Sequence, residues 1–247
     1  MERPEVARRR LLASWPAMDF DALTFDCYGT LIDWERGLLA VLQPLCHAHG
    51  VTATDDELLE AYARHEAALE AGPWRPYRQV LEDALRGLAA EHGFEPGAEE
   101  VAALPASVGD WPAFPDATEA LTRLRERFRL GVITNCDDDL FARSRQRLGV
   151  RFDWVITAAQ ARSYKPSLRN FELALETMAL PRERILHVAQ SLFHDHVPAK
   201  RLGLATAWID RRHDRPGFGA TPPARARPDV VVPDLRSFAD LALRADS

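Results

Sequence analysis

The sequence predicts an α/β protein in which a doubly wound parallel sheet carries an inserted all-helical domain. Three observations lead to this prediction. Short apolar strands alternate with helical stretches from about residue 114 onward. One further short apolar strand stands alone near the start of the chain, and a long helical stretch separates it from the others. Strand–helix alternation with short connections is typical of a parallel sheet with helices on both faces.

Each predicted strand is a short apolar run that is followed by turn-forming or polar residues. The first, Ala22–Phe25, ends at Asp26, and Gly29 breaks the pattern soon afterwards. The later strands are expected at 130–134, Trp154–Thr157, Ile185–Ala189, Ala205–Ile209 and Val230–Val232. Helices are expected between them, for example at 117–127, 140–148 and Leu168–Met178.

The first strand is expected to join the later ones in one sheet, which makes residues 33–113 a helical insertion. The sequence therefore predicts a tail at 1–17, a sheet-bearing core at 18–32 and 114–247, and a helical cap at 33–113. Open parallel sheets bind ligands at the carboxyl ends of their strands, so we expect the cap to lie over an active site. Residues 211–228, rich in Pro, Gly and Arg, are interpreted as a surface loop.

Composition excludes several classes of protein. The 247 residues carry a formal charge of −6, so the clustered positive charge that nucleic acid or anionic lipid requires is not expected. No apolar run approaches the length of about 20 residues that a membrane helix needs. Cys27, Cys46 and Cys136 are too few and too scattered for a disulfide framework or a thiolate metal site. A cytoplasmic protein without nucleic-acid or membrane partners is expected.

Chemistry-bearing side chains stand at the ends of the predicted strands. Asp26 follows the first strand and precedes Thr30 by four residues, and Thr134 ends a later strand. Lys165 precedes Pro166 in a loop, and Asp195 follows the strand that ends at Ala189. In these four motifs the chain resembles the haloacid dehalogenase superfamily. The resemblance implies a Rossmann-like core, a cap, and a nucleophilic carboxylate at Asp26.

Two positions depart from the phosphatases of that superfamily. Tyr28 stands where they carry a general acid, and Gln190 stands where they carry a magnesium ligand. A phenol is a far weaker acid than a carboxyl group, and magnesium prefers anionic oxygen. A halide leaves as a stable anion, so its departure needs neither a general acid nor a magnesium ion. Tyr at the second position is also what the L-2-haloacid dehalogenase branch carries, so the resemblance implies hydrolysis of short 2-haloacids to 2-hydroxy acids, with no metal and no cofactor.

The resemblance also implies a role for each site residue. Asp26 is the nucleophile that forms the ester, and Thr30 belongs to the same motif as Asp26. Lys165 keeps the Asp26 carboxylate ionised, and Asp195 orients or deprotonates the hydrolytic water. The backbone N–H groups of Cys27 and Tyr28, with the Thr134 hydroxyl, would hold the substrate carboxylate. Asn135 and a cap arginine would receive the halide. Arg64 is the arginine at the expected place, with Arg75 and Arg78 as substitutes, and Phe171 would add a ring to the substrate site.

Other interpretations remain open. The enzyme could act on another small activated carboxylate, such as a four-membered cyclic imino acid, or it could be a variant phosphatase. A non-catalytic binding protein with the same fold is a further alternative. Gln190 and Leu192 replace polar residues that the dehalogenases use, and His194 and His196 are expected to be exposed at the start of a helix. A small 2-haloacid is the expected partner, and a homodimer is compatible with the sequence.

Overall fold

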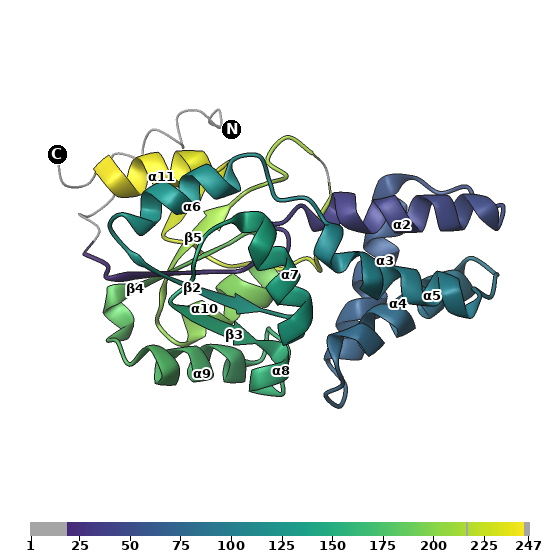
Figure 1. The fold of residues 1–247 in the computed structure, drawn as a ribbon, viewed down its shortest axis with the longest axis horizontal. Coiled ribbons are helices and arrows are strands. Elements are labelled where there is room, and N and C mark those ends of the chain that lie inside the picture. The colour runs from purple at the N-terminus through teal and green to yellow at the C-terminus, as the bar shows by residue number, and fades with distance from the viewer. Residues whose placement is uncertain (1–18, 216, 245–247) are drawn as a thin grey trace.

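The computed structural model describes residues 19–215 and 217–244, so the tail expected at 1–17 lies outside the described residues. Six parallel strands form one sheet in the order β3-β2-β1-β4-β5-β6 (Figure 1). This confirms the predicted fold class. The strands are β1 (Ala22–Phe25), β2 (Arg129–Thr134), β3 (Trp154–Thr157), β4 (Ile185–Ala189), β5 (Ala205–Ile209) and β6 (Val230–Val232).

Helices cover both faces of this sheet. In Figure 1, α6 (Ala117–Arg125) and α11 (Leu235–Arg244) pack together on one face, and α9 (Leu168–Met178) lies on the other, in contact with α10 (Val197–Arg201). The residues of β1 and β4 are all buried, as a central strand between two helical layers requires. The remaining core elements are α7 (Asp138–Leu148), α8 (Ala158–Ala161), the short helix η2 (Arg182–Arg184) and the single π-helical turn η3 (Leu192–His196).

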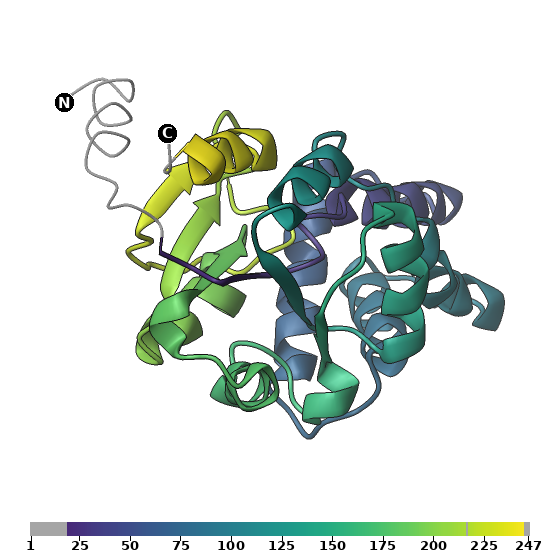
Figure 2. The same ribbon diagram turned by 60° about the vertical axis from the view of Figure 1, so that its left-hand side comes forward.

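The interval between β1 and β2 begins with four helices that lie to one side of the sheet (Figures 1 and 2). They are α2 (Trp34–Ala48), α3 (Asp55–Glu70), α4 (Tyr77–Glu91) and α5 (Ala98–Ser107), followed by the short helix η1 (Val108–Asp110). We call α2 to α5 the cap. None of the helices in the described ranges is both long and apolar enough to cross a bilayer.

The order of the strands fixes where a ligand site can form. After β1, the chain forms β2 and β3, which lie in the sheet on one side of β1. It later forms β4, which pairs with the other edge of β1. Connections therefore diverge at the carboxyl end of β1, and such a switch point leaves a crevice in an open parallel sheet. Asp26 is the first residue after β1, so this crevice opens directly above it.

The described part of 211–228 forms no helix or strand and is largely exposed or half-buried, as the predicted surface loop requires, but a portion of it is buried. Ala220 is fully buried, and its backbone N–H donates to the Glu35 carboxylate of α2 at 3.1 Å. Arg212 forms ion pairs with Glu35 and with Asp56 of α3. The segment therefore lies partly against the cap, where two acidic cap residues pair with Arg212.

Candidate active site

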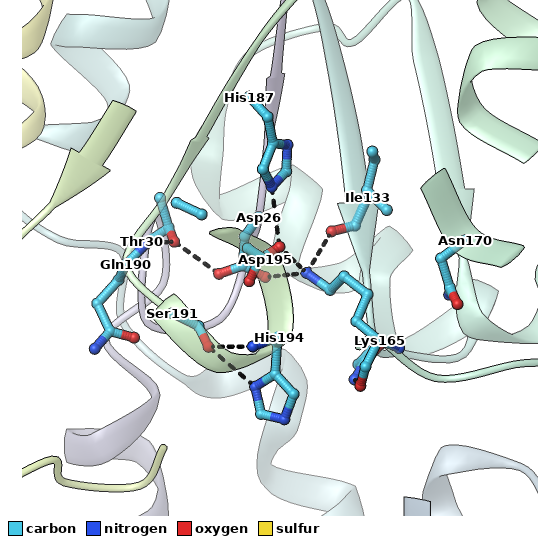
Figure 3. Close-up of polar contacts among 12 residues, drawn as sticks. Asp26, Thr30, Ile133, Lys165, Asn170, His187, Gln190, Ser191, His194 and Asp195 are labelled. Atoms are coloured by element: carbon cyan, nitrogen blue, oxygen red, sulfur yellow. Dashed lines mark hydrogen bonds and ion pairs between the residues drawn. The ribbon is translucent and has the colours of Figure 1, made fainter. Parts of the chain in front are cut away.

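Asp26 is held by hydrogen bonds to each of its carboxylate oxygens. The Thr30 hydroxyl donates to Oδ2 at 2.7 Å, and Lys165 Nζ donates to Oδ1 at 2.9 Å (Figure 3). The Thr30 oxygen in turn accepts the backbone N–H of Gln190 at 2.9 Å, which joins the β1 and β4 ends. Gly29 has φ +95°, a conformation that glycine tolerates, and it lets the loop turn back so that Thr30 reaches Asp26.

Lys165 is 1% exposed and uses all three of its ammonium protons. Nζ donates to Asp26 at 2.9 Å, to Asp195 at 2.7 Å and to the carbonyl oxygen of Ile133 at 2.9 Å. Burial alone would lower the pKa of Lys165, but the carboxylates of Asp195 and Asp26 raise it instead. Burial raises the pKa of the Asp26 carboxyl, and the charge and hydrogen bond of Lys165 oppose that rise. The lysine is thus a fixed cation shared by two carboxylates.

Asp195 is fully buried at the start of a further polar chain. His187 Nε2 lies 3.0 Å from Asp195 Oδ1, and His187 Nδ1 lies 2.9 Å from the Thr24 hydroxyl. Burial would raise the pKa of Asp195, but Lys165 and His187 hold it below its ordinary value. Its second oxygen, Oδ2, has no hydrogen-bond partner among the described residues, so this acceptor is available to a ligand or a water.

His187 is a site residue that the sequence analysis missed. It lies in the middle of β4, whose five residues are all buried. A histidine inside a fully buried strand needs a polar partner, and that requirement is the sequence signal that could have revealed it. Phe171 packs edge-on against the His187 ring, with 5.0 Å between ring centroids. The prediction that Phe171 contacts substrate is not supported, because it lies in the apolar cluster on that face of the sheet and does not line the cavity described below.

The residues do not fit the magnesium site that phosphatases of this fold use. The Tyr28 hydroxyl lies 2.9 Å from Ser144 Oγ, and burial raises its pKa well above the ordinary value. The Gln190 side-chain oxygen lies 3.4 Å from the Thr221 hydroxyl. Asp26 and Asp195 both bind Lys165, and no group of three acidic, His or Cys residues in the described ranges is arranged to hold a metal.

A small cavity of about 30 Å³ lies between the sheet edge and the cap. This is room for roughly two waters. Its lining includes Asp26, Asn135 and Lys165 from the core, and Trp34, Glu66 and Glu70 from the cap. Neither Thr134 nor Cys27 lines this cavity. The fully buried Thr134 hydroxyl has no hydrogen-bond partner in the part of the chain that the structure describes, and the Cys27 side chain is fully buried.

Asn135 links the loop that carries Lys165 to the cap. Its side-chain oxygen accepts the backbone N–H of Lys165 at 2.7 Å, and its Nδ2 donates to the Lys165 carbonyl oxygen at 3.0 Å. The same Nδ2 lies 3.1 Å and 3.2 Å from the two carboxylate oxygens of Glu70. The amide that was expected to receive a halide therefore faces a cap carboxylate.

The structure does not place the predicted cap arginine in the cavity. The Arg64 side chain is 58% exposed and pairs with Glu91 at 2.6 Å. On α3 the residues that line the cavity are Glu66 and Glu70, and the fully buried Tyr62 precedes Glu66 by the same interval of four residues. Arg64 is two residues from both Tyr62 and Glu66. Residues two apart do not share a face of a helix, so the Arg64 side chain points away from the cavity side of α3. The substitutes, Arg75 and Arg78, pair with Asp83 and Asp139 and do not line the cavity either.

His194 and His196 are also placed differently from the expectation. Both are buried, because η3 turns them inward instead of beginning an exposed helix. Burial lowers the pKa of each to about 4, so both are neutral near pH 7. His194 lines the cavity, whereas His196 lies 3.0 Å from the carbonyl oxygen of Ala189 and stays in the core.

The switch-point carboxylate, the buried lysine and the helical cap together define a hydrolase of the haloacid dehalogenase type. The sequence matches the family of haloacid dehalogenase-like hydrolases over residues 20–192, and the chain belongs to that family. It is similar to the pyrimidine 5'-nucleotidase YjjG of Escherichia coli, with 26% identity covering 83% of this chain and 92% of the relative. It is equally similar to the (S)-2-haloacid dehalogenase H-109 of Pseudomonas putida, with 27% identity covering 84% and 93%.

Solved structures support the same fold. The L-2-haloacid dehalogenase of Xanthobacter autotrophicus superimposes with a TM-score of 0.76 at 19% identity, covering 92% of this chain and all of that one. At that identity the likeness bears on the fold alone. Because the curated relatives include both a nucleotidase and dehalogenases, the substrate has to be argued from the site.

Proposed function

We propose that this protein is a metal-independent hydrolase in which Asp26 attacks carbon, with short 2-haloacids as its first candidate substrates. The observation that carries the proposal is the arrangement of Lys165 between Asp26 and Asp195 while the Tyr28 hydroxyl is bound to Ser144. No carboxylic acid stands at position 28 to protonate a departing alkoxide. A leaving group that departs as a stable anion needs no such proton.

The first half-reaction follows from the position of Asp26. One carboxylate oxygen attacks the carbon that bears the halogen, the C–O bond forms as the C–halogen bond breaks, and halide leaves with the electron pair. The Thr134 hydroxyl, unpartnered among the described residues, is the proposed donor to the substrate carboxylate, together with the N–H groups of Cys27 and Tyr28. Attack opposite the halide inverts the carbon once.

In the second half-reaction, water attacks the carbonyl carbon of the Asp26 ester. Asp195 is the proposed group that orients this water, because its Oδ2 is buried and has no partner among the described residues. Cleavage returns the Asp26 carboxylate and releases a 2-hydroxy acid. An L-2-haloacid should therefore give the D-2-hydroxy acid.

A single turnover in ¹⁸O water tests the ester. With enzyme in excess over 2-chloropropanoate, the first product should contain unlabelled oxygen, and the label should appear in the peptide that contains Asp26. Asp26→Asn should abolish halide release, and exhaustive chelation should leave the rate of the unsubstituted protein unchanged. Labelled product in the first turnover would contradict the proposal, and so would a rate that collapses with chelator and returns with magnesium.

A further inference from the structure

The cap presents two carboxylates to the cavity on the side facing Asp26. Glu66 and Glu70 are four residues apart on α3, so both lie on one face of the helix. Glu66 is 3% exposed and the Glu70 side chain is 4% exposed, and both line the same cavity as Asp26. Carboxylates are rarely buried to this extent without a cationic partner.

The groups that hydrogen-bond this pair do not supply that cation. Arg162 lines a neighbouring cavity together with Glu70, but its guanidinium lies over the Trp74 ring, 3.9 Å from the ring centroid. Glu66 Oε1 accepts hydrogen bonds from the hydroxyls of Tyr62 at 2.8 Å and Tyr77 at 2.7 Å, both neutral donors. Glu70 accepts from the neutral amide of Asn135. Lys165 is the one cationic side chain among the described residues that line the cavity, and it already pairs with two other carboxylates. The titratable groups facing the pair are Tyr62, Tyr77, Tyr164, Lys165 and His194.

A second observation at the same place also points to a ligand site. His194 Nε2 is buried, lines the cavity and has no hydrogen-bond partner among the described residues. It lies 3.7 Å from Glu70 Oε2, beyond hydrogen-bond distance, and the His194 side chain is only 10% exposed. A polar ligand group beside Glu70 would give this nitrogen a partner.

The charge of the cavity favours a ligand that carries a positive group in addition to its carboxylate. Asp26, Asp195 and Lys165 sum to −1, and each ionised cap carboxylate adds a further negative charge. Burial raises the pKa of Glu66 to about 7 and that of Glu70 well above its ordinary value. A cation bound between them would favour their ionised forms, because an opposite charge at short distance stabilises a carboxylate.

We propose that Glu66 and Glu70 bind the protonated amine of a small substrate and hold its electrophilic carbon against Asp26. This inference rests on the proposed function, since it assumes that a carbon is attacked there. Two kinds of substrate share this chemistry: a 2-haloacid that also carries an amino group, and a strained cyclic amine. In the first, halide takes the electron pair of the broken bond. In the second, the ring nitrogen takes it and leaves as a neutral amine, because it is already protonated.

Binding to the Asp26→Asn protein tests the site without turnover. Two probe pairs are matched in size and differ in the amine: 3-amino-2-chloropropanoate with 2-chlorobutanoate, and azetidine-2-carboxylate with cyclobutanecarboxylate. Isothermal titration calorimetry at pH 8 should show that the amine binds at least about tenfold more tightly in one pair or both. A preference in the first pair alone identifies the halogenated source, and a preference in the second alone identifies the cyclic amine.

Substitutions in the same protein assign the preference to residues. Combining Glu66→Gln with Glu70→Gln should abolish it, whereas Glu60→Gln, an exposed position on α3, should leave it unchanged. Circular dichroism and thermal unfolding check the fold, and each single variant serves if the double variant does not fold. The inference is overturned if neither amine is preferred or if the preference survives in these variants. A third outcome separates the two proposals. If the amines bind more tightly but the unsubstituted protein forms no ester on Asp26, the amine site is retained and the proposed function is rejected.

Discussion

The two walls of the cavity are built on opposite electrostatic principles. On the core wall, two carboxylates share one lysine, and every proton of that lysine is used. On the cap wall, Glu66 and Glu70 accept hydrogen bonds only from neutral groups. The core wall therefore balances its carboxylates with a cation of its own, whereas the cap wall holds its carboxylates with neutral donors. The comparison teaches that the sheet edge is the wall suited to the proposed reaction, and that the cap is the wall on which the proposed selection of substrate depends.

Removing the cation of the core wall should have the largest effect. Lys165→Met leaves Asp26 and Asp195 buried together without a counter-charge, which raises the pKa of Asp26 and favours its protonated, non-nucleophilic form. We expect activity to fall by about 10³-fold or more and stability by about 3–5 kcal/mol. Halide release and urea unfolding measure the two effects.

The chain offers a matched control for that substitution. Lys200 is partly exposed, and its ion pair with Asp229 lies away from the cavity. Lys200→Met should change stability by no more than about 1 kcal/mol and leave activity unaltered. Equal activity in the Lys165→Met and Lys200→Met proteins would show that the cation of the core wall is no more important for activity than a surface lysine.

The buried carboxyl groups of the cap wall should make the free energy of unfolding depend on pH. The folded protein binds the Glu66 proton more tightly than the unfolded chain does, because burial raises its pKa from 4.5 to about 7. The unfolded chain therefore loses this proton first, and the free energy of unfolding should decrease as the pH rises from about 4.5 to about 7. Glu66→Gln should remove about 1–3 kcal/mol of that decrease.

Urea unfolding at pH 5 and pH 8 measures this difference, with Glu60→Gln as the exposed control on the same helix. Only the difference between the unsubstituted protein and the variant reports on Glu66, because Glu70 contributes a decrease of the same sign. An identical pH dependence in the Glu66→Gln protein would show that this carboxyl is not the buried acid described above.

Disrupting the contact between the core and the start of α4 should reduce stability by a smaller amount. Asp137, after β2, accepts the backbone N–H groups of Tyr77 at 3.0 Å and Arg78 at 3.1 Å, at the start of α4. Asp137→Ala removes this capping interaction, so we expect a loss of about 0.5–2 kcal/mol, measured by urea unfolding. Asp139→Ala, which removes an exposed ion pair to Arg78, should cost less. Equal losses would mean that the cap is not anchored through Asp137.

The smallest catalytic effect is expected at Tyr28. Its hydroxyl lies against Ser144, so Tyr28→Phe should reduce stability by about 1 kcal/mol through the lost hydrogen bond. The kcat for a 2-haloacid should remain within about threefold of the original value, because the leaving anion needs no proton. A hundredfold decrease in kcat, without unfolding, would identify Tyr28 as a proton donor and would place an acid on the core wall.

The core wall could be predicted from the sequence because strand ends and motif spacing identify its residues. Asp26, Thr30, Lys165 and Asp195 come together as the resemblance implies. The cap wall could not be predicted in this way. Acidic residues occur along the whole of α3, and nothing local separates Glu66 and Glu70 from the exposed Glu60. Their role depends on which face of the helix meets the sheet, and only tertiary packing decides that.

The burial of Lys165 makes it a built-in reporter of access to the cavity. The chain has two lysines, Lys165 and Lys200, whose side chains are 1% and 33% exposed. An amine-reactive acylating reagent should therefore modify Lys200 readily, and it can reach Lys165 only when the cavity opens. Because the carboxylates also hold Lys165 in its protonated, unreactive form, the informative quantity is the change in the ratio of the two modification rates when a ligand is added, read by mass spectrometry of the two peptides.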